Sequence, residues 1–294
     1  RLCFRTTCAG FIALLLSLGC AIPCAASQTE RPRRVLIIPS YNFDYQGSQL
    51  FLQGVLKEFN QRSPFKVIFF HENLQLATRA LDSQRQKNII DSLKIKYSLE
   101  KPDLVIVQYK QALQFMIRSG RDIFGDCPVV FAGLGFENYR ELKIPDRFTG
   151  IIASFSAKKN IDLILRNHPA VERIYVVGGS SPMEQELVNR AIQEGAGYRD
   201  KVEFVNLSNL TFEELLSRLN KVRDRSAVLY NLMQLDAAGK TFVPALAARE
   251  IAQSTLAPVY GMLDTYMGTG IAGGFLVNQE GLGTRAAEIG TEIL

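Results

Sequence analysis

Blocks of apolar residues alternate with longer amphipathic segments from residue 34 to the end of the chain. The runs RVLIIP (34–39), KVIFF (66–70) and DLVIVQ (103–108) have the length of strands rather than of helices. Over residues 46–61, apolar side chains instead recur at helical spacing. Continuous apolar strands separated by helices are typical of a parallel sheet that is covered on both faces. The pattern therefore predicts an α/β fold.

The alternation occurs twice, which indicates two lobes. In the first set we also expect a strand at 127–133 and helices over 83–99 and 110–119. The irregular segment 135–150 follows, and the rhythm then restarts. The second set is expected to hold strands at 173–179, 202–207, 226–232 and 257–262, and helices over 157–167, 182–196 and 240–253. Thr211 and Glu214 have the spacing of a capping box at the start of one more helix.

We predict a two-lobed α/β fold in which each lobe is a parallel sheet flanked by helices. The first lobe is expected to span residues 34–148 and the second residues 149–264. The terminal piece, 265–294, contains IAGGFLV and a helix from Gly283, and it has no partner strand left in the second lobe. We therefore expect it to return to the first lobe across the hinge.

Residues 1–26 have the layout of a secretory signal peptide, with positive charge, then an apolar run, then small residues. Cleavage after Ala26 is favoured, because Cys24-Ala25-Ala26 puts small residues at both recognition positions. Two alternatives stay open: lipidation at Cys20, whose SLGC box is imperfect, and retention of the stretch as a membrane anchor. All three place the folded part in the periplasm or elsewhere outside the cytoplasmic membrane of a bacterium, and the two alternatives tie it to that membrane.

Composition argues against a nucleic-acid partner and against a disulfide framework. The net charge is +5, yet residues 1–34 contribute +4 of it and the remainder is close to neutral. Nucleic-acid binders usually carry a basic patch in their folded part. Four of the five cysteines lie in the leader, and the fifth, Cys127, is expected to be a buried, inert thiol. With only two histidines in the chain, we expect no histidine-based metal site.

Motifs for catalysis or cofactor binding do not stand where such chemistry needs them. The turn after the first strand, PSYNFDYQG (39–47), lacks the glycine pattern of a dinucleotide fold, and the chain has no GxSxG nucleophile elbow. VVGGSSPM (176–183) puts glycines at a helix start, where backbone N–H groups can hold an anion, but a plain strand–helix turn also explains it. We expect no cofactor, no metal and no catalytic residue in this region.

Polar and aromatic residues gather where the expected strands end, which is where ligands bind in open α/β sheets. Tyrosine and phenylalanine offer flat apolar walls, while aspartate, asparagine and glutamine offer directional hydrogen bonds. The residues that we expect to contact a ligand are Tyr41, Asp44, Gln108, Gly133, Tyr230, Asp236, Tyr260 and Asp264. A contact with Asp44 or Asp264 would favour an amine or a hydroxyl-bearing compound, and an aromatic ligand would stack on Tyr41 or Tyr260.

The segment FTGIIASFSAKKNIDLILRNHPAVERIYVVGGSS (148–181) resembles the bacterial ABC-type substrate-binding proteins with the type I periplasmic-binding fold. The subgroup in question includes tryptophan and tyrosine binders. The matching features are Thr149-Gly150 at the hinge, the step from Pro169 to Ile174 before YVV, and the closing glycine pattern in Pro258–Gly261, Gly270–Gly273 and Gly283–Ala287. The loop after the first strand is aromatic here, where the family usually has hydroxyl groups or glycines, so the resemblance does not carry over a ligand.

The resemblance implies a small organic ligand, such as an amino acid, enclosed between two lobes, and no enzymatic activity in this region. We expect the extracytoplasmic sensor region of a membrane histidine kinase or diguanylate cyclase, because YNFDYQG (41–47) resembles such versions. The sequence also stops within an expected helix at Leu294, so we expect a further segment to follow. The alternative is the periplasmic substrate-binding component of an ABC importer, whose partner would be a permease.

Overall fold

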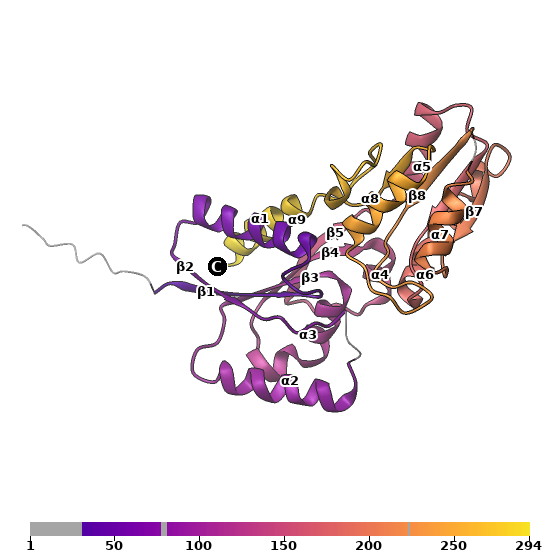
Figure 1. The fold of residues 1–294 in the computed structure, drawn as a ribbon. Helices are drawn as coiled ribbons and strands as arrows, with labels where there is room; N and C mark the ends of the chain where they lie inside the picture. Colours follow the sequence, from indigo (N-terminus) through magenta and orange to yellow (C-terminus); the bar gives the residue numbers. More distant parts are fainter. Residues whose placement is uncertain (1–30, 78–80, 223) are drawn as a thin grey trace, which may run out of the picture. The chain divides into compact units, whose positions relative to one another are not determined.

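The computed structural model describes residues 31–77, 81–222 and 224–294 (Figure 1). The expected signal peptide or anchor, residues 1–26, lies outside these ranges together with its lipidated and retained alternatives. The chain divides into a short unit, Arg1–Arg31, and one compact unit, Pro32–Leu294, and everything below concerns the second. Within the described ranges, no helix combines the length and the apolar character needed to cross a bilayer.

The first sheet has five parallel strands within the described residues, in the order β2-β1-β3-β4-β5. They are β1 (Arg33–Pro39), β2 (Val67–His71), β3 (Leu104–Gln108), β4 (Val129–Gly135) and β5 (Phe148–Ala153). Every residue of β3 is buried, because helices cover both faces of the sheet. This is the reason that the strand reads as an unbroken apolar run in the sequence.

Two pairs of longer helices cover the two faces of this sheet. One face holds α1 (Gln46–Arg62) and α9 (Gln279–Ile293), and the other holds α2 (Ser83–Lys96) and α3 (Tyr109–Phe124). The short α4 (Phe136–Glu141) follows β4. Figure 1 shows α9 beside α1, and Leu282 and Ala286 share a buried cluster with Phe51 and Val55 of α1. Helix α9 thus packs against the first sheet, whereas Tyr266 belongs to a buried cluster of the second sheet and Ile271 packs against that cluster, and the return of the whole piece 265–294 across a hinge stays a prediction.

The second sheet has four parallel strands within the described residues, in the order β7-β6-β8-β9. They are β6 (Arg173–Val177), β7 (Glu203–Leu207), β8 (Ser226–Tyr230) and β9 (Val259–Gly261). Its helices are α5 (Ala157–Asn167) and α6 (Pro182–Glu194) on one face, and α7 (Phe212–Leu219) and α8 (Pro244–Ser254) on the other. Short 3₁₀ helices are η1 (Ala196–Tyr198) and η2 (Asp264–Tyr266). The expected capping box of Thr211 and Glu214 is confirmed at the start of α7.

The structure corrects three local expectations. Residues 135–150, read as irregular, include α4 and the start of β5, whose pairing with β4 also puts residues 149–153 in the first sheet. IAGGFLV forms no continuous strand, and it joins the end of the second sheet through isolated bridges from Gly273 to Tyr260 and from Val277 to Leu263. Helix α8 begins at Pro244, because residues 236–240 first close a turn around the Asp236 carboxylate. The division into two ligand-binding lobes stays a prediction.

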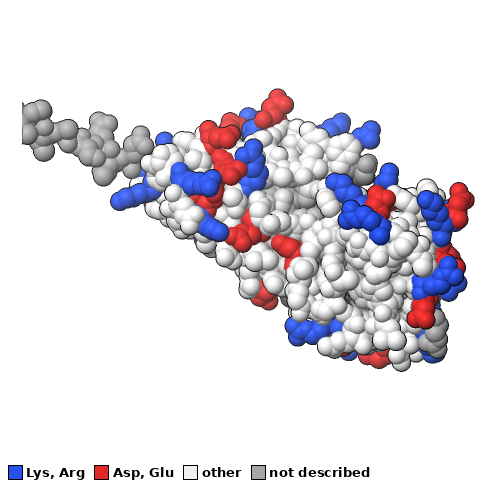
Figure 2. Space-filling view, turned by 90° about the horizontal axis from the view of Figure 1, so that it is seen from above, with Lys and Arg blue, Asp and Glu red and all other residues white. Residues whose placement is uncertain are grey.

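Surface charge and the lone thiol agree with the composition. On the face seen in Figure 2, basic and acidic side chains are interspersed, and no continuous basic area stands out among the described residues. Ion pairs such as Arg173–Glu203, at 2.7 Å, join charges of opposite sign at the surface. Cys127 is free and buried, as predicted, and burial raises the pKa of its thiol to about 12.

Candidate functional site

A cavity of about 620 Å³ lies at the carboxyl ends of the strands of both sheets, and we call it the central cavity. From the first sheet it is lined by residues that follow β1, β3, β4 and β5, and from the second by residues that follow β8 and β9 and by α6, the helix after β6. The parallel arrangement explains this lining, because each strand is followed by a helix whose first turn points back to the same edge. The first turns of α1, α3, α5 and α8 all contribute.

Tyrosine rings form one wall of the central cavity. The ring of Tyr41 lies 5.6 Å from that of Tyr45 and 5.8 Å from that of Tyr109, the latter edge-to-face. Burial is the main cause that raises the pKa of each hydroxyl above its ordinary value, and the nearby carboxylate of Glu184 adds to the effect at Tyr41. The three phenols are therefore neutral at physiological pH and offer flat surfaces with hydrogen-bonding hydroxyl groups.

The backbone is strained where Tyr109 enters this wall. Tyr109 has a φ of +68°, a left-handed conformation that few non-glycine residues adopt. Its ring lies against Gly133, itself at φ +78°, where an added Cβ would stand 2.9 Å from two ring carbons. Its hydroxyl donates a hydrogen bond to Oε1 of Gln279 at 2.7 Å. The absence of a side chain at Gly133 thus makes room for the ring of Tyr109 at the cavity.

Beneath the rings lies a buried polar network that ties the end of the chain to the first sheet. Gln279, at the start of α9, accepts a hydrogen bond from Nε2 of Gln108 at 3.3 Å as well as the bond from Tyr109. Its backbone N–H donates to Oδ2 of Asp264 at 2.8 Å. Burial is the largest influence on Asp264 and raises the pKa of its carboxyl.

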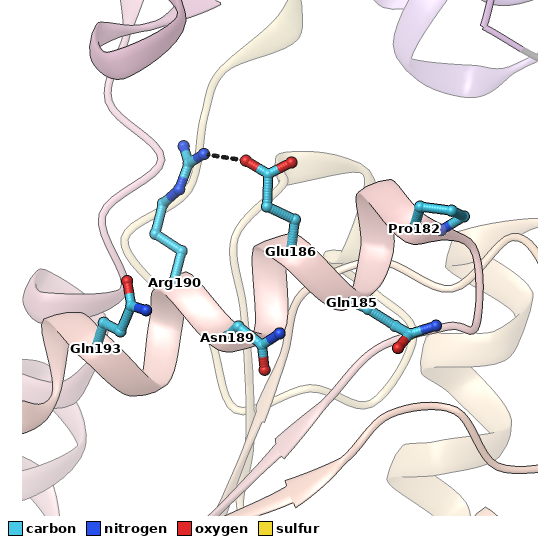
Figure 3. A pocket seen from close by; sticks show the side chains of 6 residues that line it. All are labelled: Pro182, Gln185, Glu186, Asn189, Arg190 and Gln193. Carbon is cyan, nitrogen blue, oxygen red and sulfur yellow. Dashed lines mark hydrogen bonds and ion pairs between the residues drawn. The ribbon is translucent and has the colours of Figure 1, made fainter.

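Charged side chains stand on other parts of the cavity lining. Lys110 donates to Asn138 at 2.7 Å, and the guanidinium of Arg190 pairs with Glu186 at 2.7 Å. Figure 3 shows that Glu186 and Arg190 project from α6 side by side. A second hollow, of about 550 Å³, also uses these two residues, but its whole lining belongs to α6 (Figure 3). A single helix encloses no ligand, so we assign the site to the central cavity.

Comparisons with solved structures identify the fold. No family model matches the chain, and no curated protein matches it. Among solved structures, a conserved domain protein from Vibrio cholerae has a TM-score of 0.62 at 15% identity, covering 90% of this chain and 85% of that one. A ligand-free, open substrate-binding protein with adhesive properties from Clostridium difficile gives 0.61 at 15%, covering 89% and 84%. An ABC domain from Streptococcus pneumonia in complex with L-Trp gives 0.59 at 15%, covering 89% and 84%.

This chain has the type I periplasmic-binding fold. The likeness covers both parallel sheets and their flanking helices, and at such low identity it shows the fold alone. In this fold the central cavity lies where the chain passes from one sheet to the other. One passage leads from β5 to α5 through residues 154–156, and the other leads from β9 to α9 through residues 262–278.

The structure brings some of the expected ligand-contacting residues to the central cavity. Tyr41 and Gly133 line it. Gln108 and Asp264 do not line it, but both are bonded to Gln279, which does. Asp44 is exposed and lies outside the lining. Ligand contact stays a prediction for all of them, and the geometry favours the first two.

Three expected residues face other parts of the protein. The hydroxyl of Tyr230 donates to the carbonyl of Pro244 at 2.9 Å, and that of Tyr260 bonds Asn167 and His168, each at 3.1 Å. Asp236 accepts from three backbone N–H groups in its own turn and at the start of α7. None of these three lines the central cavity in the described structure, so their ligand contact stays a prediction without geometric support.

Alternation along the strands explains why position at a strand end was not enough. Neighbouring side chains of a strand point to opposite faces, so Val259 packs against α8 while Tyr260 packs against α5. A residue just beyond the strand is needed to reach the edge itself. Asn231, directly after β8, does so, and its carbonyl accepts a hydrogen bond from the buried Tyr266 hydroxyl at 2.9 Å.

Sequence reasoning left out several lining residues. Tyr109 stands directly after the expected strand 103–108, and Asn231 lies near the end of the expected strand 226–232, so the same signal points to both. Tyr45 belongs to the aromatic loop that carries Tyr41. Ser48 and Gln279 lie in first turns of helices, and nothing in the sequence pattern distinguishes them from surface residues.

Proposed function

We propose that this chain binds a small organic molecule in the central cavity without converting it. The observation that carries the proposal is a cavity of about 620 Å³ that is lined by residues from both sheets and has tyrosine rings on the side of the first sheet. Ligand sites typically have volumes of roughly 300–1,000 Å³, apolar walls and a few fixed polar groups. In support, the similar solved structures include a substrate-binding protein and an ABC domain in complex with L-Trp.

Two biological roles are compatible with such binding. The role of an ABC importer's binding component is favoured by the descriptions of the similar structures from Clostridium difficile and Streptococcus pneumonia. The role of an extracytoplasmic sensor for a histidine kinase or diguanylate cyclase rests on the resemblance of the YNFDYQG loop alone. In both, a ligand that touches both lobes would favour a closed arrangement over an open one.

The coding sequence beyond Leu294 separates the two uses. A transmembrane segment followed by a kinase or cyclase domain supports the sensor, and a stop codon shortly after Leu294 supports the importer component. In either case the folded part would stand outside the cytoplasmic membrane, with a permease or a fused output domain as its partner.

Binding itself is tested by a thermal-shift screen with the twenty amino acids and a panel of small aromatic carboxylates. A ligand present at 100 times its Kd stabilises the folded state by about 2.7 kcal/mol, which a melting curve detects readily. Calorimetry then gives the Kd for the parent and for two matched variants. Tyr45→Ala removes a ring from the cavity wall, whereas Tyr139→Ala removes an exposed ring that does not line it.

The expected result is a loss of affinity of about fivefold or more for Tyr45→Ala, since the contact of one ring with a ligand contributes about 1–3 kcal/mol. Tyr139→Ala should bind as the parent does. Equal affinity of all three proteins for a ligand would place binding outside the central cavity and overturn the proposal.

A further inference from the structure

The first turn of α1 borders the central cavity with a buried hydroxyl group, that of Ser48, while the backbone N–H groups of Ser48 and Gln49 are bonded to the carbonyl of Tyr45. Ser48 is 2% exposed and lines the cavity, and its hydroxyl finds no hydrogen-bond partner among the described residues. The residue before the helix, Tyr45, supplies no side-chain cap, and residues 46–49 include no acid. A helix N-terminus in this state carries partial positive charge and N–H groups that favour an anion.

Gln279 provides a second donor at the same place. It is fully buried and lines the cavity, and its Nε2 has no partner among the described residues. The orientation of its carboxamide is fixed by the oxygen, because Oε1 accepts hydrogen bonds from the hydroxyl of Tyr109 and from Nε2 of Gln108. A Cβ on Gly47 would meet the Gln279 side chain at 3.8 Å, so the amide lies beside the start of α1.

A buried donor without a partner costs free energy, and a ligand atom that accepts its hydrogen bond recovers that cost. Ser48 and Gln279 both offer donors, and the helix N-terminus between them adds positive potential. A carboxylate satisfies all three because each of its two oxygens accepts hydrogen bonds and the group is anionic.

Asp264, the acid that is bonded to Gln279, does not oppose this assignment. Asp264 is bonded through Oδ2 to the backbone of Gln279 and does not line the cavity. Burial raises the pKa of its carboxyl and thereby favours its neutral form. The cavity lining also holds three basic side chains, Lys110, Lys158 and Arg190, and two acidic ones, Glu186 and Glu194. Arg190 pairs with Glu186 at 2.7 Å, so the inference rests on the hydrogen-bond donors and not on the charge of the whole lining.

We infer that Ser48, Gln279 and the first turn of α1 bind the carboxylate of the ligand. The inference rests on the proposed function and narrows it to one class, small aromatic carboxylic acids, whose ring would lie against Tyr41 and Tyr109. The same subsite disfavours cationic amines that lack a carboxylate.

The test compares matched pairs of compounds that differ only in charge at the carboxyl group. Calorimetry at neutral pH measures indole-3-acetate against indole-3-acetamide, 3-phenylpropionate against its amide, and 4-hydroxybenzoate against its amide. We expect at least one carboxylate to bind with a Kd at least tenfold lower than that of its amide. This ratio is measured on the parent protein and so does not depend on whether any variant folds.

Two serine variants test whether Ser48 is responsible for the preference for the carboxylate. Ser48→Ala should reduce the preference for the carboxylate to less than threefold. Ser180→Ala is the control, because its hydroxyl is also buried and unpaired among the described residues but lies outside the cavity lining, and it should keep the full preference.

An amide that binds as tightly as its carboxylate, or an unchanged preference in Ser48→Ala, overturns the inference and leaves the proposed function intact. If no compound of the wider screen binds at all, the proposed function fails, and the inference fails with it.

Discussion

The contact between α1 and α9 gives the most direct test of how this fold assembles its site. At the crossing, the two helices approach through Gly54 and Gly283. A Cβ at Gly54 would overlap the carbonyl oxygen of Glu280 and stand 2.8 Å from the backbone nitrogen of Thr284. A Cβ at Gly283 would overlap the carbonyl oxygen of Phe51. The obstacles are backbone atoms, which no rotamer change can move.

Gly283→Ala should therefore push the helices apart. The new methyl would also lie 2.9 Å from the carbonyl carbon of Phe51 and 3.0 Å from the nitrogen of Val55, where ordinary contact begins at 3.4 Å. Overpacking of this kind costs about 1–3 kcal/mol, and contact with rigid backbone belongs at or above the upper end. Alanine regains about 1 kcal/mol of helix propensity. The net loss of stability should be about 2 kcal/mol, which is a fall in Tm of about 4–8 °C for a chain of this size.

Scanning calorimetry or circular dichroism measures the change. Gly197→Ala is the matched control, because nothing lies within 4 Å of its added Cβ and its backbone is not in the left-handed region. Because α9 carries Gln279, Gly283→Ala should also weaken ligand binding. A Tm within 1 °C of the parent for Gly283→Ala would refute the reasoning, since it would mean that the two helices do not approach through these glycines.

Three further substitutions test single features of the structure. Gly133→Ala forces an alanine into the left-handed conformation and displaces the ring of Tyr109. Unfolding studies should show a loss of stability of at least about 1–2 kcal/mol, and calorimetry should show weaker ligand binding. Asp236→Asn turns an amide N–H group toward one of three backbone donors and should cost about 1–3 kcal/mol at neutral pH. Burial would raise the pKa of Asp236, but those donors hold it below its ordinary value, so the parent's advantage should shrink as the pH falls through that pKa. The pKa of Asp264 is raised in the folded state, so its ionisation penalises folding as the pH rises above the pKa of the unfolded chain. Asp264→Asn should therefore gain stability relative to the parent between acid and neutral pH. A difference in stability that stays unchanged across that range contradicts the shift.

The fold could be predicted because its signals are local. The strands around Ile37 and Ile106 are buried on both faces and so read as continuous apolar runs. The amphipathic helices between them fix the parallel arrangement, and the capping box at Thr211 marks a helix start without any tertiary information. Strand β5 was missed because Phe148–Ala153 follows a proline-containing loop and includes Gly150, which weakens the strand signal.

The site could be predicted only in part because it depends on which face each side chain takes. Tyr260 and Tyr230 stand at strand ends, but their strands turn them into the packed faces, where their hydroxyls bond other parts of the second sheet's layers. Gln279 is the opposite case. It lies outside every expected strand and helix, and only the packing of α9 against α1 brings it to the start of α1. Contacts across more than two hundred residues leave no periodic trace in the sequence.

The order of the strands explains why the cavity lies where it does. In the first sheet, the connection from β1 leads to one neighbour through α1, and that from β3 leads away from β1 through α3 on the other face. The two helices therefore diverge after β1 and β3, and such a reversal of strand order leaves a crevice beyond the carboxyl ends.

The second sheet repeats this device between β6 and β8, whose following helices α6 and α8 also lie on opposite faces. Tyr41 and Tyr109 follow the two diverging strands of the first sheet, and Asn231 follows one of those in the second. A ligand held at both reversals has to touch this tyrosine pair and Asn231 together. Substituting Asn231 by leucine, which is of similar size but cannot form the same side-chain hydrogen bonds, should therefore lower the affinity for the same ligand whose affinity Tyr45→Ala lowers. A ligand affected by only one of the two changes would occupy only one side of the cavity.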